Sequence, residues 1–232
     1  MACILCIETS TKVCSVALAV DGEIVYSELS TEGPSHAVLL GVFAEKGLEE
    51  AKKRNLIPDA VAVSCGPGSY TGLRIGVSLA KGICFGYDIP IIGIPTLKIM
   101  TFWAISRQGN ATGIYYPMLD ARRMEVYSAL YDQEGREIRE TCAEIIEPRF
   151  LEKVPGVGTV FLFGNGAEKC KLLADSSRAV FLEDIFPVAT EMVGLAEERF
   201  RHGLMEKAAY FEPFYLKEFQ ATIARNKVLG QV

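Results

Sequence analysis

The chain has 232 residues, 50% of them hydrophobic, and its 24 Lys and Arg against 29 Asp and Glu give a net charge of −5. So much apolar material excludes a mostly disordered chain, and the acidic balance argues against unaided nucleic-acid binding, since neutralising phosphates needs a basic surface. No run reaches the roughly 18 apolar residues of a membrane span, and seven scattered cysteines predict reduced thiols in a cytoplasmic protein rather than a disulfide framework.

The first thirty residues predict a three-stranded antiparallel meander. A continuous apolar run opens the chain, as expected for a central strand buried on both faces, and Asp21-Gly22 marks a tight turn between two later runs. The expected strands cover residues 3–7, 13–20 and 24–29. Cys3 and Cys6, three residues apart on the first strand, would point to opposite faces and are not expected to share a metal ion.

Helices and strands alternate from there to residue 105. The first helix is expected to begin near Ser35, a suitable N-cap, and to end in the basic run 52–54. The expected elements that follow are a strand over 60–64, a helix over 73–85, a strand over 89–94 and a helix over 96–105. The polar, Gly-rich segment 107–113 is the best candidate for a domain boundary. It predicts an N-terminal lobe at 1–106 and a C-terminal lobe at 107–232.

The second half begins again with strands. We expect strands over 114–120 and 125–131, another after Gly135, then a strand over 159–163, a helix over 167–174, a strand over 179–182 and a helix over 188–201. The aromatic segment 210–216 is expected to pack back on the body, and residues after 221 to be loosely held. Strands followed by βα alternation predict an α/β fold in which each lobe is a mixed sheet with flanking helices. Two such lobes in tandem indicate an actin-like or ribonuclease-H-like duplication.

A glycine-rich loop is the most informative segment of the chain. It reads Cys65-Gly-Pro-Gly-Ser-Tyr-Thr-Gly-Leu-Arg-Ile-Gly76 and lies between an expected strand and an expected helix. Glycines let a backbone approach a ligand closely, and a helix N-terminus favours an anion, so Ser69 and Thr71 could cap the helix or touch a phosphate. The spacing of its three loop glycines, Gly66, Gly68 and Gly72, fits neither the dinucleotide fingerprint nor the P-loop.

One carboxylate follows the first strand of each half: Glu8 in the first half and Asp120 in the second. A carboxylate followed by hydroxyl residues can hold a metal-bound phosphate, and a plain polar turn is the alternative. The hydroxyl residues here are Thr9, Ser10 and Thr11. For Asp120 the alternative is a local ion pair with Arg122. His36 and His202 are too far apart in sequence to predict a histidine metal site, and no nucleophile-elbow motif is present.

Small residues line one face of the helix that follows the glycine-rich loop. Gly72, Gly76 and Ala80 recur every four residues, and each interior glycine costs about 1 kcal/mol of helix stability relative to alanine. Close approach of another segment would offset that cost. It is either a contact within the chain or a subunit interface that also uses Leu73 and Val77, and the sequence leaves both open.

These segments together resemble the bacterial TsaB (YeaZ) family, which takes part in making threonylcarbamoyladenosine (t6A) on tRNA. The resemblance rests on the segments 7–11, 14–17 and 66–76, with later blocks at 120–127 and 213–217. It implies two actin-like lobes of the ASKHA type and a non-catalytic subunit that binds TsaD through the helices at about 35–53 and 71–86. It also implies a homodimer in the absence of TsaD, a complex that TsaE joins, and only indirect contact with tRNA.

The resemblance implies site residues of two kinds, interface residues and degenerate phosphate-type loops. The implied interface comprises His36, Leu39, Leu40, Val42, Phe43, Leu73, Arg74, Gly76, Val77 and Ala80. The turn at residues 8–11, the glycine-rich loop and the turn at Asp120 are implied to be degenerate phosphate-type loops. At position 8 this chain has Glu where the family usually has Asp. No metal and no catalytic residue are implied, because Thr96 and Met100 stand where catalytic relatives carry two histidines.

Cofactor and alternative functions follow from the same comparison. No cofactor is expected on the chain alone, and ATP or ADP at the interface of the complex with TsaD and TsaE is left open. An actin-like small-molecule kinase or ATPase with its own nucleotide site is the alternative function. A metallopeptidase is a third reading, which the missing histidine pair disfavours.

Overall fold

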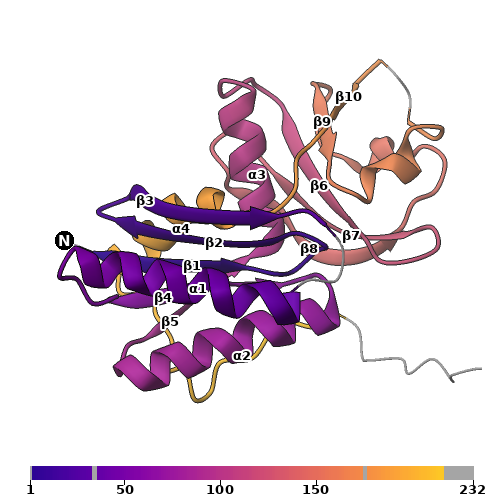
Figure 1. Cartoon of the computed structure of the whole chain (residues 1–232). Coiled ribbons are helices and arrows are strands. Elements are labelled where there is room, and N and C mark those ends of the chain that lie inside the picture. The colour runs from indigo at the N-terminus through magenta and orange to yellow at the C-terminus, as the bar shows by residue number, and fades with distance from the viewer. Residues whose placement is uncertain (1, 33–35, 175–176, 217–232) are drawn as a thin grey trace, which may run out of the picture.

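The computed structural model describes residues 2–32, 36–174 and 177–216. The expected N-cap Ser35 and the residues after 221 therefore lie outside the described part. No helix among the described residues is long and apolar enough to cross a membrane. The α/β expectation is confirmed, because two five-stranded mixed sheets form the body, with helices on their faces (Figure 1).

The first sheet has the strand order β3-β2-β1-β4-β5. The hairpins pair β1 with β2 and β2 with β3 antiparallel, while β4 and β5 join β1 in parallel. The strands are β1 (Cys3–Glu8), β2 (Cys14–Val20), β3 (Glu23–Ser30), β4 (Ala60–Gly66) and β5 (Ile91–Pro95). Central strand β1 is buried along its whole length, as its unbroken apolar run predicts.

The second sheet repeats this topology in the order β10-β9-β6-β7-β8. Again three antiparallel strands are followed by two parallel ones. The strands are β6 (Ile114–Asp120), β7 (Glu125–Tyr131), β8 (Glu137–Ile145), β9 (Val160–Phe163) and β10 (Ala179–Leu182). The expected duplication into two actin-like lobes in tandem is thereby confirmed.

The lobes differ in what connects their strands. The first lobe uses two long helices, α1 (His36–Lys53) and α2 (Tyr70–Tyr87), at the places where the second has single 3₁₀ turns, η1 (Phe150–Lys153) and η2 (Ala167–Cys170). The expected helix over 167–174 is therefore wrong in type and length. The helix expected from residue 73 begins at Tyr70, because Ser69 caps it by accepting the Gly72 N–H at 3.2 Å.

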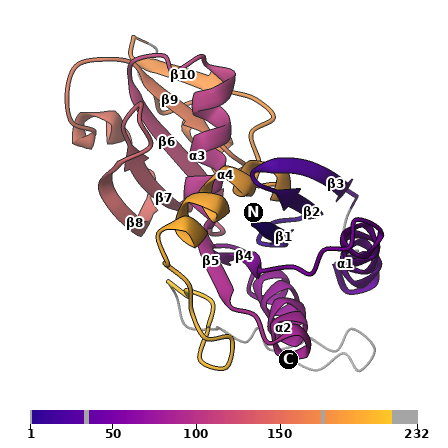
Figure 2. The same cartoon turned by 90° about the vertical axis from the view of Figure 1, so that its left-hand side faces the viewer.

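Helices also fill the space between the two sheets. Helix α3 (Thr96–Arg107) packs on the second sheet, and α4 (Ala189–Arg201) packs on the first, opposite α1 and α2 (Figure 2). The second half of the chain thus contributes a helix to the core of the first lobe. The division at residue 106 stays a prediction.

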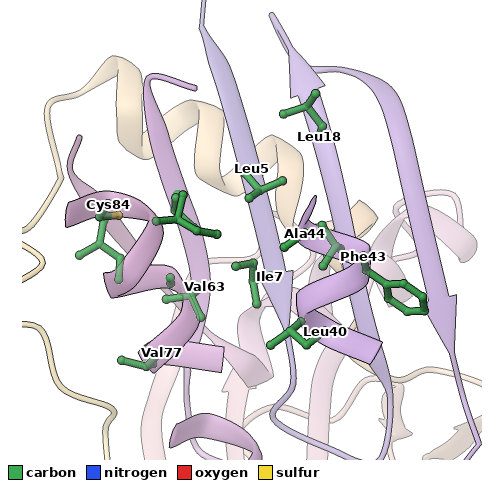
Figure 3. Close-up of a cluster of buried hydrophobic side chains, with 14 of the residues drawn as sticks. Leu5, Ile7, Leu18, Leu40, Phe43, Ala44, Val63, Val77 and Cys84 are labelled. Atoms are coloured by element: carbon green, nitrogen blue, oxygen red, sulfur yellow. The ribbon is translucent and has the colours of Figure 1, made fainter. Parts of the chain in front are cut away.

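The main apolar core lies between the first sheet and the helices α1 and α2. Figure 3 shows Leu5 and Ile7 of the central strand facing Leu40, Phe43 and Val77 of the helices. Apolar positions three or four residues apart on each helix supply this face, as the periodicity of a core-facing helix requires.

Candidate functional site

The glycines of the glycine-rich loop pack against the turn that follows β1. A Cβ on Gly68 would overlap the backbone carbonyl of Ser10, and a Cβ on Gly72 that of Thr9. A Cβ on Gly76 would overlap the Thr9 hydroxyl. Two hydrogen bonds hold the contact, Ser69 N–H to the Ser10 carbonyl at 2.6 Å and the Thr9 hydroxyl to the Gly72 carbonyl at 2.8 Å. Of the two explanations for the small-residue face, the structure supports the contact within the chain.

The fourth glycine, Gly66, lies under the C-terminal segment. A Cβ there would come within 2.6 Å of the Phe214 carbonyl oxygen, and the Phe214 N–H donates to the Cys65 carbonyl at 2.7 Å. The segment is anchored by Phe211, which is 4% exposed in the first core, and by the Lys81 ammonium, which donates to the Phe211 carbonyl at 3.0 Å. The aromatic tail thus packs on the body, as expected.

These contacts account for the loop without a ligand. At each of the four glycines, atoms of the chain itself occupy the space that a Cβ would need. Ser69 caps α2, and Thr71 is exposed on its first turn. The glycine pattern is therefore explained by close backbone packing, which takes away the main observation behind a nucleotide site in this chain.

Glu8, the last residue of β1, is fully buried. Its Oε1 accepts the Ser10 N–H at 2.5 Å, while its Oε2 and the hydroxyl oxygens of Ser10 and Ser64 are buried and make no hydrogen bond of ordinary geometry with the described residues. Burial raises the pKa of Glu8 to about 7, against the lowering effect of the Ser10 and Ser64 groups. Thr11 belongs to the same turn and accepts the Val13 N–H. An enclosed carboxyl of this kind is poorly placed to hold a metal-bound phosphate.

Asp120 has a different environment from Glu8. Its side chain is 46% exposed and binds the Lys169 ammonium at 2.6 Å, and its Oδ1 accepts the Arg122 N–H. Burial alone would raise the pKa of Asp120, but the Lys169 ammonium and the Arg122 amide hold it below its usual value. The ion pair expected as the alternative, with Arg122, is not the one found: Arg122 contributes its backbone N–H, and the ion pair in the described residues is with Lys169.

The structure does not bring the two carboxylates to one place. Glu8 pairs with Ser15 across the hairpin, and the Ser15 hydroxyl accepts the Ala189 N–H of α4 at 2.9 Å. Paired residues on neighbouring strands share a face, so Glu8 lies on the face that α4 covers. Asp120 binds Lys169, which belongs to η2, so Asp120 points to the face of the second sheet that η2 covers.

The cysteines are all free. Cys3 and Cys6 belong to the two cores on opposite faces of the first sheet, as predicted. Burial raises the pKa of Cys65, beside the glycine-rich loop, to about 11, so its thiol stays protonated near neutral pH and is a weak nucleophile.

The two positions at which the resemblance implies histidines in catalytic relatives are occupied here by buried residues of α3. Thr96 and Met100 are both 0% exposed, and the Met100 methyl lies against Gly164 of the second lobe. Within the described residues, no three His, Cys, Asp or Glu side chains gather as a metal ion would need.

The outer face of α1 and α2 is the other candidate site. A groove of about 650 Å³ runs between them, lined by apolar side chains such as Leu48, Leu79 and Ile83 and by Glu45 and Glu49 on its rim. Large apolar side chains stand exposed on the same helices and the turn after α1, namely Val38, Val42, Ile57, Phe85 and Tyr87. Phe85 is 90% exposed. Of these side chains, Ile57 and Tyr87 line the groove itself, and an apolar groove with exposed apolar side chains is typical of an interaction surface.

Three glycines on this pair of helices have no packing reason among the residues that the structure describes. A Cβ on Gly41, Gly82 or Gly86 would meet nothing within 4 Å. Each of them lowers helix stability relative to alanine, and close approach of a second molecule would explain that cost. The glycines are visible in the sequence, but only the helix packing separates them from Gly72 and Gly76.

The predicted interface residues divide into two groups. Six of the ten lie in the core: Leu40, Phe43, Leu73, Gly76, Val77 and Ala80. The other four reach the surface: His36, Leu39, Val42 and Arg74. His36 Nε2 lies 3.0 Å from the Val13 carbonyl, and the Arg74 guanidinium lies 4.4 Å from the centroid of the Tyr70 ring. An interface on this face would therefore use the outer residues of the two helices.

Comparison with known proteins places the chain in a family. A family model described as "TsaD: tRNA N6-adenosine threonylcarbamoyltransferase" matches residues 30–225. The Escherichia coli "tRNA threonylcarbamoyladenosine biosynthesis protein TsaB" is 32% identical over 98% of this chain and 99% of its own. The chain belongs to the TsaB (YeaZ) family. Its fold is similar to that of YeaZ from Pseudomonas aeruginosa, with a TM-score of 0.78 and 25% identity over 93% of this chain and 100% of that one.

A second structure gives the same result. An uncharacterized Pseudomonas aeruginosa protein, described as similar to peptidase YEAZ, has a TM-score of 0.79 and 26% identity, covering 94% of this chain and 100% of that one. The two-lobe architecture found here thus extends over the whole length of both Pseudomonas aeruginosa structures.

Proposed function

We propose that this chain is a non-catalytic partner subunit, which binds a TsaD-type transferase and supports formation of t6A on tRNA, in a complex that TsaE joins. Relatives named for threonylcarbamoyladenosine biosynthesis support a role in that pathway. The outer face of α1 and α2 carries the proposal, because it combines a groove, exposed apolar side chains and three unexplained glycines.

The proposed mode of action is assembly. The α1/α2 face would bury its apolar groups against TsaD, and against a second copy of this chain when TsaD is missing. Burial of apolar area provides the driving force for such an association, and the helical glycines would allow the partner backbone to approach closely. The tRNA would be contacted through the partner, in keeping with the acidic charge of this chain.

The non-catalytic role is supported by the chemistry of the candidate residues. Glu8 is enclosed, the loop glycines are packed against the chain itself, and Cys65 has a raised pKa. We propose that the chain alone binds no cofactor and that any ATP or ADP binds where TsaD and TsaE meet it. The free thiols suit a cytoplasmic protein.

Light scattering on the chain alone and mixed with TsaD, with and without ATP, tests the proposal. We expect a homodimer that converts to a one-to-one complex. Gly82→Arg and Phe85→Asp should each weaken both assemblies at least tenfold, because they place a bulky or charged group on the face without disturbing the core. Val157→Asp, at a site 93% exposed in the second lobe, is the matched control and should leave both unchanged.

Two results would contradict the proposal. A monomer indifferent to TsaD would remove the partner role, and calorimetry would then show whether the chain binds Mg-ATP by itself. Normal assembly of the Gly82 and Phe85 variants would place the interface elsewhere. Gly76→Arg is not a useful test, because its side chain would collide with Thr9 inside the monomer.

A further inference from the structure

A buried polar cluster lies where β1 and β4 end, and partner binding does not use it. Glu8, Ser10 and Ser64 are 0%, 1% and 0% exposed. Glu8 Oε2 and both hydroxyl oxygens make no hydrogen bond of ordinary geometry in the described part of the chain, although the two hydroxyls act on the carboxyl as hydrogen-bond donors that lower its pKa. Buried polar atoms without partners are costly and rare in folded proteins, so the cluster needs an explanation.

The surroundings offer no compensating charge. None of the cationic side chains in the described part of the chain pairs with Glu8, whose neighbours are the Ser10 amide and the hydroxyls of Ser10 and Ser64. On the neighbouring strands, the titratable groups that sense it are Cys14 of β2 and Cys65 of β4, both with pKa values of about 11 and hence neutral.

Charged groups also lie on the elements that cover the same face of the first sheet as Glu8. Arg199 of α4 and Glu206 of the C-terminal segment influence the pKa of Cys65, and Glu197 of α4 influences that of Cys6. Glu191, in the first turn of α4, is itself a carboxyl whose pKa burial raises. A charge on Glu8 would thus be enclosed and unpaired, which is strongly unfavourable in a protein interior.

The cluster is mechanically connected to the glycine-rich loop. The two residues after Glu8 make the contacts that hold the first two turns of α2, through the Ser10 carbonyl and the Thr9 hydroxyl. At Gly68, Gly72 and Gly76 there is no free space on that side. A change in the Glu8 carboxyl therefore cannot displace the turn without displacing the start of α2.

We propose that Glu8, Ser10 and Ser64 form a proton-operated switch at the base of α2. With its proton, Glu8 is a neutral acid that can donate its O–H to a neighbouring hydroxyl and keep the turn seated under the loop. When the proton leaves to water, the buried carboxylate pushes the turn outward and shifts the first turns of α2. The meaning of this shift for partner binding rests on the proposed function, whereas the switch itself does not.

The electrostatics agree with this geometry. Burial raises the pKa of Glu8 to about 7, which is close to physiological pH and within the range where an ordinary glutamate is fully ionised. A change of less than one pH unit would therefore alter the charge of the cluster substantially.

Nuclear magnetic resonance on the full chain tests the switch without a partner. The Glu8 side-chain carboxyl carbon and the amide nitrogens of Gly68, Gly72 and Gly76 are followed from pH 5 to pH 9. We expect all four signals to move with one common midpoint near 7. In Glu8→Gln the glycine signals should stop titrating, and in Asp120→Asn, the matched carboxyl of the second lobe, they should titrate as in the parent chain.

The outcomes separate clearly. A Glu8 midpoint below pH 5, or glycine signals that do not move with Glu8, would overturn the switch. If Glu8→Gln fails to fold, Ser64→Ala serves instead and should shift the common midpoint, because it removes one of the hydroxyls beside the carboxyl. Loss of partner binding with an intact titration would count against the proposed function and leave the switch standing.

Discussion

The two lobes share one strand order but use it differently. In the first, the parallel strands are joined through α1 and α2, each 18 residues long, whereas the second has η1 and η2 of 4 residues each. The first lobe therefore presents a long helical face with a groove, and the second has no comparable helical face in the described residues. The sheets are the common framework of the duplication, and the connections decide which lobe has a helical face for the proposed partner.

The same difference is seen at the ends of the first strands. Both loops carry closely packed glycines: Gly68 and Gly72 lie on the turn after β1, and Gly164 and Gly166 lie on the end of β6. The carboxylates beside them have opposite environments: Glu8 is enclosed without a cation, and Asp120 is half exposed beside Lys169. A shared position in a repeated fold thus does not fix the charge state of a side chain.

The largest effect should come from adding a methyl group at Gly72. Gly72→Ala places a Cβ on the Thr9 carbonyl, and backbone cannot rotate away, so the free energy of unfolding should fall by about 3 kcal/mol. Gly166→Ala, whose Cβ would have its nearest atoms at 2.9–3.1 Å, should cost about 1–2 kcal/mol. Urea unfolding of both variants measures the difference. Equal losses would mean that the two loops are equally tight.

The pH dependence of stability should separate the two carboxylates. Because burial raises the Glu8 pKa from 4.5 to about 7, the folded chain holds an extra proton in that window. The stabilisation is complete below pH 4.5 and is lost as the pH rises toward 7, by about 3 kcal/mol. Glu8→Gln should remove this slope in urea unfolding.

The contribution of Asp120 to stability should have the opposite pH dependence. Its pKa is lowered, so its contribution is present above pH 4 and is lost as the pH falls. Asp120→Asn should therefore leave the slope between pH 5 and pH 7 unchanged. A parent chain of constant stability from pH 5 to pH 7 would show that Glu8 is ionised throughout.

A smaller change should sharpen the contrast between the inner and outer faces of α2. Gly82→Ala meets nothing within 4 Å and should raise the free energy of unfolding of the isolated chain by about 0.5–1 kcal/mol, since alanine favours the helix. Gly76→Ala, six residues closer to the loop and on the inner face, should lower it despite the same gain, because its Cβ would overlap the Thr9 hydroxyl. Thermal melting of the two variants distinguishes the faces, and a destabilised Gly82 variant would contradict the assignment.

The smallest effect should come from the ion pair of the second lobe. Lys169→Met removes the partner of Asp120, and exposed pairs contribute about 0.2–1 kcal/mol. The loss should shrink further in high salt, because screening weakens exposed pairs. Melting temperatures at low and high salt measure it, and a loss above about 2 kcal/mol would mean that the pair is more enclosed than its exposure indicates.

Much of the fold could be predicted from local patterns. The apolar runs and tight turns located most strands within one or two residues, and the stop at Asp21-Gly22 is seen between β2 and β3. The helix expected over 167–174 failed because its apolar residues serve the core from a short 3₁₀ turn, in which Ala167 and Cys170 are buried. Local periodicity cannot tell the two apart when a segment is short.

The candidate site was predicted less well than the fold. The glycine-rich loop was correctly singled out, but its glycines are required by close packing against Thr9, Ser10 and Phe214, which are distant in sequence. Six predicted interface residues lie in the core because the apolar stripe of an amphipathic helix faces its own sheet first.

The sequence by itself determined the class of fold, the duplication and the family, because these rest on local periodicity and on a motif readable in chain order. Only the tertiary structure decided which glycines of α2 face inward and that Glu8 is buried while Asp120 is not. The physical reason is that burial and charge pairing depend on which distant segments meet. Local spacing records the direction in which a side chain points on its own element, but not what it meets there.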